Sequence, residues 1–326
     1  MSSKKETVIR AFRGEAVDRI PVGFWKHYIK DFGKFNAGLE DKAVIEENLA
    51  GAKKFKEEFD PDFVKIMTDG YFYIPVVGDT LDTVEVDESK KAAYTADFVK
   101  LIEGYREIYG DDTFLAVNIF SPLGVVQSAI SDGFGDNTPR IQNALKTTPE
   151  KVLAAVSRVA DGIIDVINAS VKPGLADGIY FSVNTLGNTI PEDEYKAFIA
   201  PAEEKIIAAA NKLSQDNILH ICGYMGSRNN LNIFKDYDVE VINWAVYAEN
   251  FGLKEGKEFF GNKAVIGGFG NTKNDILYKG TKEEIEAEVK KIIADVGRAG
   301  VIVGADCTVP SDIDIERLKW VRDALK

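Results

Sequence analysis

Gly178-Ile179-Tyr180-Phe181-Ser182-Val183 is a short apolar run, and residues 191–213 and a second such run at 217–222 follow it along the chain. Both runs have the length and the β-branched or aromatic content of strands. Residues 191–213 instead repeat their apolar positions every three to four residues, as an amphipathic helix does. A strand, a helix and a further strand form a βαβ unit, in which the two strands are parallel.

The same alternation extends along the whole chain. Apolar, β-prone runs recur at residues 19–25, 63–67, 114–120, 178–183, 217–222, 239–246, 264–268 and 301–305. Further amphipathic helices are expected at 148–169 and 281–299. Eight strand–helix repeats predict an α/β fold, the (β/α)₈ TIM barrel. Because no linker or low-complexity segment divides the chain, we expect a single domain spanning residues 1–326, with an N-terminal helical extension at 4–13 that covers one end of the barrel.

Charge and composition exclude several classes of partner. The 326 residues carry a net charge of −12, which opposes binding to nucleic acid or to an anionic membrane surface. No apolar run approaches the roughly 20 residues of a transmembrane helix, and the first residues lack the apolar core of a signal peptide. We therefore expect a cytoplasmic protein whose partners are small molecules or another protein. A homodimer stays open.

Most of the few histidines and cysteines in the chain form one sequence pattern. The chain has only two histidines and two cysteines, yet His220, Cys222 and Cys307 all fall at the ends of expected strands. One imidazole and two thiolates are ligands that suit Zn²⁺, and three protein ligands leave a fourth position open, as in catalytic zinc sites. The alternatives are buried structural cysteines, a disulfide or a core histidine. A stable disulfide is disfavoured in a cytosolic protein.

Polar residues also mark the ends of the other strands. In a TIM barrel these ends meet at one face, where the chemistry takes place. We expect His27 and Asp69 to act in catalysis, by substrate contact or proton transfer, although His27 could instead be a structural histidine behind Trp25. A fourth metal ligand, such as Glu249 or Asp306, is left open. The residues expected to contact substrate are Lys26, Ser182, Asn184 and Asn243.

Three segments carry a resemblance to a known family or to one of its branches. The opening Arg10-Ala11-Phe12-Arg13-Gly14-Glu15-Ala16-Val17-Asp18-Arg19-Ile20-Pro21-Val22 resembles the start of the uroporphyrinogen decarboxylase superfamily, and Val64-Lys65-Ile66-Met67-Thr68-Asp69 looks like its second strand. Within that superfamily, His-x-Cys with a distant Cys is typical of the zinc methyltransferase branch, which includes the methylcobalamin:coenzyme M methyltransferases. Gly304-Ala305-Asp306-Cys307-Thr308-Val309-Pro310 resembles the last-ligand loop of that branch.

Departures from the true decarboxylases favour the same branch. Their first loop is rich in arginine, whereas Phe24-Trp25-Lys26-His27-Tyr28-Ile29-Lys30 has none. Their tyrosine after the third strand is replaced by a segment beginning at Ser121, and Cys307 lies about where they have a late histidine. The resemblance thus implies a zinc-dependent transfer of a methyl group between a corrinoid and a small thiol or methylated substrate. The direction of transfer stays open.

The corrinoid is expected on a separate protein, because neither histidine has the neighbours of an Asp-x-His-x-x-Gly cobalamin loop. That partner must dock at the open face of the barrel. For this role we expect exposed aromatic and apolar residues after the second strand, and the nominees are Tyr71, Phe72, Tyr73, Ile74 and Pro75. The alternative is an ordered loop packed on its own barrel.

Two further functions remain as alternatives. One is a decarboxylase-like lyase acting on a small acid, with Asp69 and His27 as the acid–base pair and Cys307 incidental. The other is a non-catalytic barrel that binds a corrinoid or tetrapyrrole with His220 as a ligand. A metal-free active protein would select the first alternative, and tight retention of a coloured cofactor would select the second.

Overall fold

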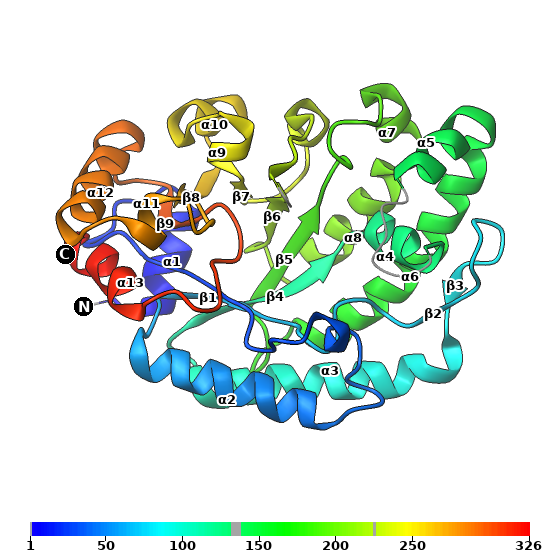
Figure 1. Cartoon of the computed structure of the whole chain (residues 1–326), viewed down its shortest axis with the longest axis horizontal. Coiled ribbons are helices and arrows are strands. Elements are labelled where there is room, and N and C mark those ends of the chain that lie inside the picture. The colour runs from blue at the N-terminus through cyan, green and yellow to red at the C-terminus, as the bar shows by residue number, and fades with distance from the viewer. Residues whose placement is uncertain (1, 132–137, 224–225) are drawn as a thin grey trace.

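Seven parallel strands form one curved sheet in the order β1-β4-β5-β6-β7-β8-β9 (Figure 1). The computed structural model describes residues 2–131, 138–223 and 226–326. A separate antiparallel pair joins β2 to β3. The strands are β1 (Phe63–Ile66), β2 (Val76–Val77), β3 (Glu85–Val86), β4 (Phe114–Phe120), β5 (Gly178–Val183), β6 (Ile218–Ile221), β7 (Val241–Trp244), β8 (Ala264–Phe269) and β9 (Val301–Ala305).

The expected first strand, residues 19–25, is reduced to a single bridge. Val22 pairs in parallel with Val303 of β9, and its carbonyl accepts a 2.9 Å hydrogen bond from the backbone N–H of Asp62, just before β1. A regular strand does not form because Pro21 has no N–H, and the N–H of Val22 donates to the Asp62 carboxylate instead (3.0 Å). The fold is therefore TIM-barrel-like, with seven regular strands rather than the predicted eight.

Helices cover the outside of the curved sheet (Figure 1). Neighbouring helices pack in the pairs α2 with α3, α3 with α6, α6 with α8, and α12 with α13. No helix in the described ranges combines the length and apolar character needed to span a membrane. The helices are α1 (Lys4–Phe12), η1 (Phe32–Lys34), α2 (Ala43–Glu58), α3 (Glu88–Tyr109), α4 (Pro122–Ala129), α5 (Thr138–Thr147), α6 (Pro149–Ser170), α7 (Glu192–Phe198), α8 (Ala200–Asn211), η3 (Leu231–Phe234), α9 (Val246–Glu249), α10 (Leu253–Phe259), α11 (Ile276–Lys279), α12 (Lys282–Val296) and α13 (Ile315–Ala324).

Helices α6 and α12 lie close to their predicted positions, but the single helix predicted at 191–213 is wrong. The chain forms α7 and α8, separated at Ile199, whose φ of −120° departs from helical geometry. Pro201 explains the break, because proline is tolerated in the first turn of a helix but disrupts a helix interior. The break gives this βα connection two short helices in place of one.

Helix α1 seals the end of the barrel from which the strands start. Val8, Ala11 and Phe12 belong to the same apolar cluster as inward-facing strand residues, and the Phe12 ring lies 5.1 Å from that of Phe114 at the start of β4. The N-terminal helical extension is thus found where it was expected. The opposite face, formed by the carboxyl ends of the strands, is where a TIM-like fold carries its site.

The segment after β1 is packed, not exposed. Tyr71 is only 1% exposed and its hydroxyl donates to the Gly38 carbonyl (2.8 Å), while Ile74 is 4% exposed. The Phe72 ring lies 4.8 Å from Phe120 of β4. The prediction of an exposed docking edge is therefore wrong at Tyr71 and Ile74, because the aromatic side chains are used to fix the loop on its own fold.

Candidate metal centre

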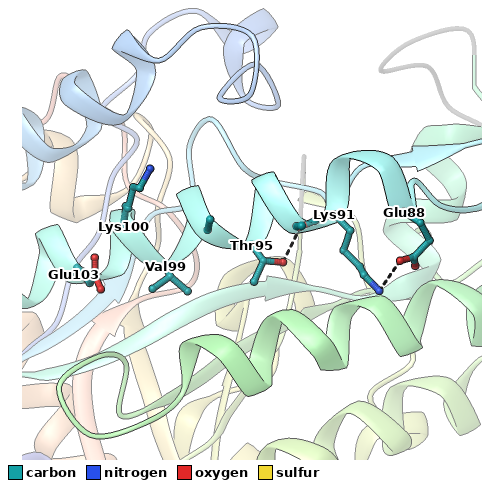
Figure 2. Close-up of a pocket in the computed structure, with 8 residues that line it drawn as sticks. Glu88, Lys91, Thr95, Val99, Lys100 and Glu103 are labelled. Carbon is teal, nitrogen blue, oxygen red and sulfur yellow. Dashed lines mark hydrogen bonds and ion pairs between the residues drawn. The ribbon is translucent and has the colours of Figure 1, made fainter.

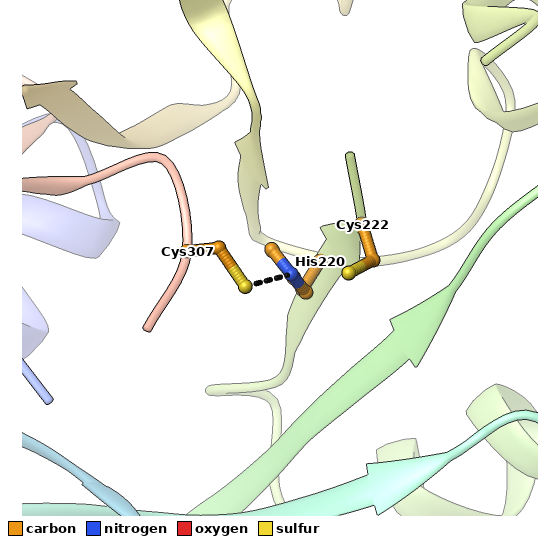
Figure 3. A group of neighbouring side chains, drawn as sticks. All are labelled: His220, Cys222 and Cys307. Carbon is orange, nitrogen blue, oxygen red and sulfur yellow. Dashed lines mark hydrogen bonds between the residues drawn. The ribbon is translucent and has the colours of Figure 1, made fainter. Parts of the chain in front are cut away.

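Three ligand residues meet where β6 and β9 end (Figure 3). His220 lies in β6, Cys222 directly follows it, and Cys307 lies two residues beyond β9. Their ligand atoms all lie within 4.8 Å of one another, and Cys307 Sγ is 3.4 Å from His220 Nε2. Both cysteines are free thiols. The sequence prediction that these three side chains converge is confirmed, and the disulfide alternative is excluded in this structure.

The tautomer of His220 is fixed by the hydrogen bonds of Asn243. The Asn243 amide nitrogen donates to the carbonyls of Ile266 (2.8 Å) and Ala305 (3.2 Å), so its Oδ1 must be the acceptor facing the histidine. His220 Nδ1–H therefore donates to Asn243 Oδ1 (2.5 Å). Tyr180, whose pKa burial raises well above its ordinary value, donates its hydroxyl to the same oxygen (2.6 Å). The lone pair of His220 Nε2 is left to face the two sulfurs.

The sulfur side of the group is the accessible side. His220 is 1% exposed, whereas Cys222 and Cys307 are both partly exposed. The pKa of the Cys307 thiol lies well below its usual range, chiefly because of a hydrogen bond with Cys222, while burial acts in the opposite direction and the positive charge of Lys65 adds to the lowering. A thiol with a lowered pKa readily becomes the thiolate that binds metals.

These donors fit zinc. One imidazole nitrogen with a free lone pair and two thiol sulfurs form a set that zinc accepts in tetrahedral geometry. Ligand atoms around a tetrahedral zinc lie roughly 3.5–4 Å apart, which agrees with the separation of His220 Nε2 and Cys307 Sγ. The acceptor behind His220 Nδ1 is the kind of partner that holds a metal-binding imidazole in place.

Neither proposed fourth ligand belongs to this group within the described part of the chain. The Glu249 carboxylate accepts one hydrogen bond from the backbone N–H of Asn229 (2.8 Å) and one from its side-chain amide (3.0 Å). The same side-chain amide donates to the Cys222 carbonyl, so Glu249 helps to hold the segment that carries this cysteine. Asp306 accepts from the N–H of Tyr247, and burial raises the pKa of its carboxyl to about 8. Three protein donors therefore form the group, and one side of it is open.

His27 and Asp69 form a second polar pair at this face. His27 Nδ1 lies 2.7 Å from Asp69 Oδ1, and the other carboxylate oxygen accepts from the N–H of Tyr28 (3.0 Å). Asp69 is fully buried, while the His27 side chain is 22% exposed and packs on the ring of Phe35 at 4.7 Å. Donation from Nδ1 leaves His27 Nε2 as a proton acceptor, the arrangement that a general base requires.

The four residues predicted to contact substrate have different surroundings in the structure. Ser182 donates to Asn118 (3.1 Å) within the strands, and Asn184 lies at the end of β5 with its Oδ1 accepting from the N–H of Leu186. Lys26 instead donates to the Ser311 carbonyl in the segment that follows Cys307. Asn243 is fully buried behind His220, so the structure gives it a positioning contact with a ligand rather than an exposed surface for substrate.

Sequence reasoning missed Lys65, which lies inside the barrel. It is 6% exposed, and its Nζ lies 4.5 Å from the ring centre of Tyr180, whose ring is itself 5.1 Å from His220. The signal was present in the sequence. Lys65 alternates with Phe63 and Met67 in a buried strand, so it had to point to the same interior side.

A surface hollow of about 630 Å³ lies elsewhere, along the outer side of α3 (Figure 2). It is lined by one face of that helix, including Lys91, Thr95 and Val99, and an ion pair joins Lys91 to Glu88 along the helix. None of the nine residues predicted from sequence to bind or react lines this hollow. The metal centre is thus independent of it.

Similarity to known proteins agrees with the fold. The family model described as uroporphyrinogen decarboxylase matches residues 71–326, which is most of the chain and includes all three ligands. The chain belongs to the uroporphyrinogen decarboxylase family. No curated protein sequence matches this family member.

Solved structures similar to this uroporphyrinogen decarboxylase family member include two kinds of methyl-transfer protein. A methyltransferase from Methanosarcina mazei has a TM-score of 0.75 at 17% identity, covering 99% of this chain and 98% of its own. A B12-independent methionine synthase from Shewanella sp. W3-18-1, in complex with selenomethionine, has a TM-score of 0.58 at 12% identity, with 94% and 97% covered. At these identities the likeness establishes the shared fold.

Proposed function

We propose that the chain is a zinc-dependent methyltransferase that moves a methyl group between a corrinoid protein and a small thiol or methylated substrate. The observation that carries this proposal is the meeting of His220 Nε2 with the sulfurs of Cys222 and Cys307. The fold shared with the Methanosarcina mazei methyltransferase supports the same reaction class. We further propose a cytoplasmic location.

The ligand residues and their neighbours have separate tasks in this reaction. Zinc held by the three donors would stabilise a thiol as its thiolate, or polarise the oxygen of a methylated substrate. Asn243 keeps the proton on Nδ1 of His220, so that Nε2 stays a ligand. The partly exposed His27 can receive the proton that a thiol loses, and Asp69 orients the ring.

We propose that the corrinoid comes on a second protein. The chain has no corrinoid-binding Asp-x-His-x-x-Gly segment, and its two histidines are already engaged with Asp69 and Asn243. The methyl group must then be exchanged at the open, sulfur side of the centre. Tyr71 and Ile74 are buried and are withdrawn as docking residues, while docking at the partly exposed Phe72, Tyr73 and Pro75 stays a proposal.

Metal analysis and a methyl-transfer assay test the proposal together. We expect about one zinc ion per chain, and transfer between methylcobalamin and a small thiol that stops on chelation and returns with added zinc. The change is followed by the absorbance of the corrinoid and by mass analysis of the methylated thiol. A protein that stays active after complete removal of metal would contradict the proposal.

A second candidate is the decarboxylase-like lyase, which the 2.7 Å contact between His27 and Asp69 favours. In that reaction His27 would give a proton to the carbon that loses carbon dioxide, and no metal would be needed. Activity on a small acid that survives both chelation and Cys307→Ser would select this function. Loss of all activity in Cys307→Ser would exclude it.

A further inference from the structure

The two cysteines of the centre belong to segments that the sheet does not join directly. Cys222 follows β6 and Cys307 lies two residues beyond β9, while β7 and β8 lie between these strands in the sheet. Neighbouring strands are about 4.8 Å apart, so β6 and β9 are three such steps apart around the sheet. The ligand atoms of the group nevertheless all lie within 4.8 Å of one another. The separation of the two thiols therefore depends on contacts beyond the strand ends.

The short helix α9 contacts the segment that carries Cys222. A Cβ added at Gly223, the next residue, would lie 2.4 Å from the Cβ of Ala245, which precedes the helix, so this close approach requires glycine. At the end of α9, the Glu249 carboxylate accepts from the backbone N–H and the side-chain amide of Asn229 (2.8 and 3.0 Å), and that amide donates to the Cys222 carbonyl (3.0 Å). One end of α9 is thus joined to the Cys222 segment.

The other end of α9 is joined to the segment that carries Cys307. The backbone N–H of Tyr247, in the first turn of the helix, donates to Asp306 Oδ2 (2.9 Å). The N–H of Asp306 donates to the Phe269 carbonyl at the end of β8 (2.8 Å), which fixes this residue on the sheet. Asp306 is 2% exposed, and its Oδ1 has no hydrogen-bond partner among the described residues, so this carboxylate is a costly group to bury. A single helix thus connects both cysteine segments.

We propose that α9 acts as a spacer that sets the separation of the two thiols, with Glu249 and Asp306 as positioning residues at its two ends. The inference rests on the proposed function and deepens it, because it names the residues that prepare the centre for the metal. Two ligands that are already held at the required separation lose little conformational freedom when a metal binds, so the affinity is higher. Asn243 orients the imidazole, whereas α9 acts on the sulfurs.

Zinc affinity, measured by competition with a chromogenic chelator, tests both ends of the spacer. Glu249→Ala and Asp306→Ala should each weaken zinc binding by about 10–100-fold, the range for partners that orient metal ligands. Glu249→Gln and Asp306→Asn keep an oxygen that can accept the same backbone hydrogen bond, and we expect them to restore most of the affinity.

Combining the two substitutions distinguishes a shared spacer from two independent contacts. Loss of either end already frees the helix, so Glu249→Ala combined with Asp306→Ala should bind zinc about as weakly as the weaker of the single variants. Independent local contacts would instead give fold losses that multiply, because the effects of residues that do not act together add as free energies.

The metal-free protein provides a second readout that needs no zinc. Phenylarsine oxide bridges two thiols that lie close together. Its arsenic–oxygen bond is replaced by two arsenic–sulfur bonds, and the two thiol protons leave with the oxygen as water. Wild-type protein should form one such bridge between Cys222 and Cys307, and competition with a free dithiol measures its affinity. The Ala variants should lose about as much affinity for the arsenical as they lose for zinc.

Two further variants separate an effect on spacing from an effect on stability. Asp177→Ala removes a carboxylate at the opposite end of the strands, which accepts from the N–H of Leu115 (2.9 Å) and pairs with Arg106 (2.9 Å). It should lower the unfolding temperature and leave both affinities unchanged. Gly223→Ala forces the Cys222 segment away from α9 without altering either carboxylate, and it should reproduce the loss. It replaces Asp306→Ala if that variant does not fold.

Each result supports or overturns the inference. Weaker binding of zinc and of the arsenical in both Ala variants, with the Gln and Asn variants restored and no further loss in the double variant, supports it. Unchanged affinity in either Ala variant, or losses that multiply, would overturn it. Equal losses in Glu249→Gln and Glu249→Ala would also overturn it, since the charge and not the acceptor would then matter. A wild-type protein that binds no zinc contradicts the proposed function, while the arsenical comparison still decides the role of α9.

Discussion

The two histidines of this chain are held in opposite ways. His220 is 1% exposed and donates through Nδ1 to the neutral amide of Asn243, which is itself anchored to two backbone carbonyls. His27 is partly exposed and donates through Nδ1 to the carboxylate of Asp69. An amide acceptor fixes a neutral ring without favouring its charged form, whereas a carboxylate stabilises a ring that gains a proton. Under the proposed function, the same residue type would serve as a metal ligand in one place and as a proton acceptor in the other.

The largest effect is expected from removing the ligand. His220→Gln should lower zinc content from about one ion per chain to almost none and abolish methyl transfer, because two sulfurs alone hold zinc weakly. His27→Gln is the matched variant and should keep its zinc. Both are measured by elemental analysis after dialysis. Equal loss of zinc in the two variants would contradict the assignment of His220, and not His27, as a metal ligand.

The second effect concerns proton transfer at His27. His27→Ala should leave zinc content and fold unchanged but slow turnover by about 10²–10⁴-fold, the range for a lost general acid–base group. Turnover is measured from pH 5 to 9, and the limb that reports the proton acceptor should disappear. Asp69→Asn should show part of the same loss. Normal turnover in His27→Ala would remove His27 from the mechanism and make it a packing partner of Phe35.

A smaller effect on zinc binding is expected from removing the Asn243 amide, which accepts the hydrogen bond of His220. Asn243→Ala removes the acceptor that fixes the ring, so zinc affinity should fall by about 10–100-fold while the three ligands stay in place. Competition with a chromogenic chelator gives the affinity. Asn211→Ala is the control, since that amide donates to the Asp238 carbonyl, which precedes β7 at the opposite end of the strands. An unchanged affinity in Asn243→Ala would mean that packing alone orients His220.

The smallest effect should come from Tyr180→Phe. The ring, which lies next to both His220 and Lys65, is retained, and only the hydroxyl that donates to Asn243 is lost. Asn243 keeps its bond from His220, so zinc affinity should change by about two- to tenfold, as expected for one hydrogen bond. A loss as large as that of Asn243→Ala would show that the hydroxyl, and not the amide, carries the orienting role.

Much of the fold and the ligand set could be predicted from sequence because both depend on local patterns. Continuous apolar, β-prone runs place β1 and β4 to β9, and the scarcity of histidine and cysteine singles out the three candidate ligands. Predictions failed where a contact between distant segments, and not the local sequence pattern, determines the structure. The bond from Val22 to the Asp62 carboxylate replaces a strand ladder, and the hydroxyl of Tyr71 finds the Gly38 carbonyl although its segment looks exposed.

The roles of individual polar residues were harder to predict. A strand-end asparagine contacts substrate or orients a ligand depending on its neighbours across the sheet, and the pairing of Asn243 with His220 is known only from the register of β6 and β7. Lys65 is a different case. Its place in an apolar strand was visible, but its contact with the ring of Tyr180 is a property of the folded interior.

The bridge between Val22 and Val303 also bears on how the chain reaches its folded state. The two residues lie near opposite ends of the sequence, so the segment around Val22 meets one of its neighbours only after β9 has been synthesised. During translation, α1 and residues 19–25 must wait while the intervening strands assemble, and such long-range closure is slow. Late arrival of the C-terminal strand would therefore be the step at which this protein is most exposed to aggregation or to chaperone binding.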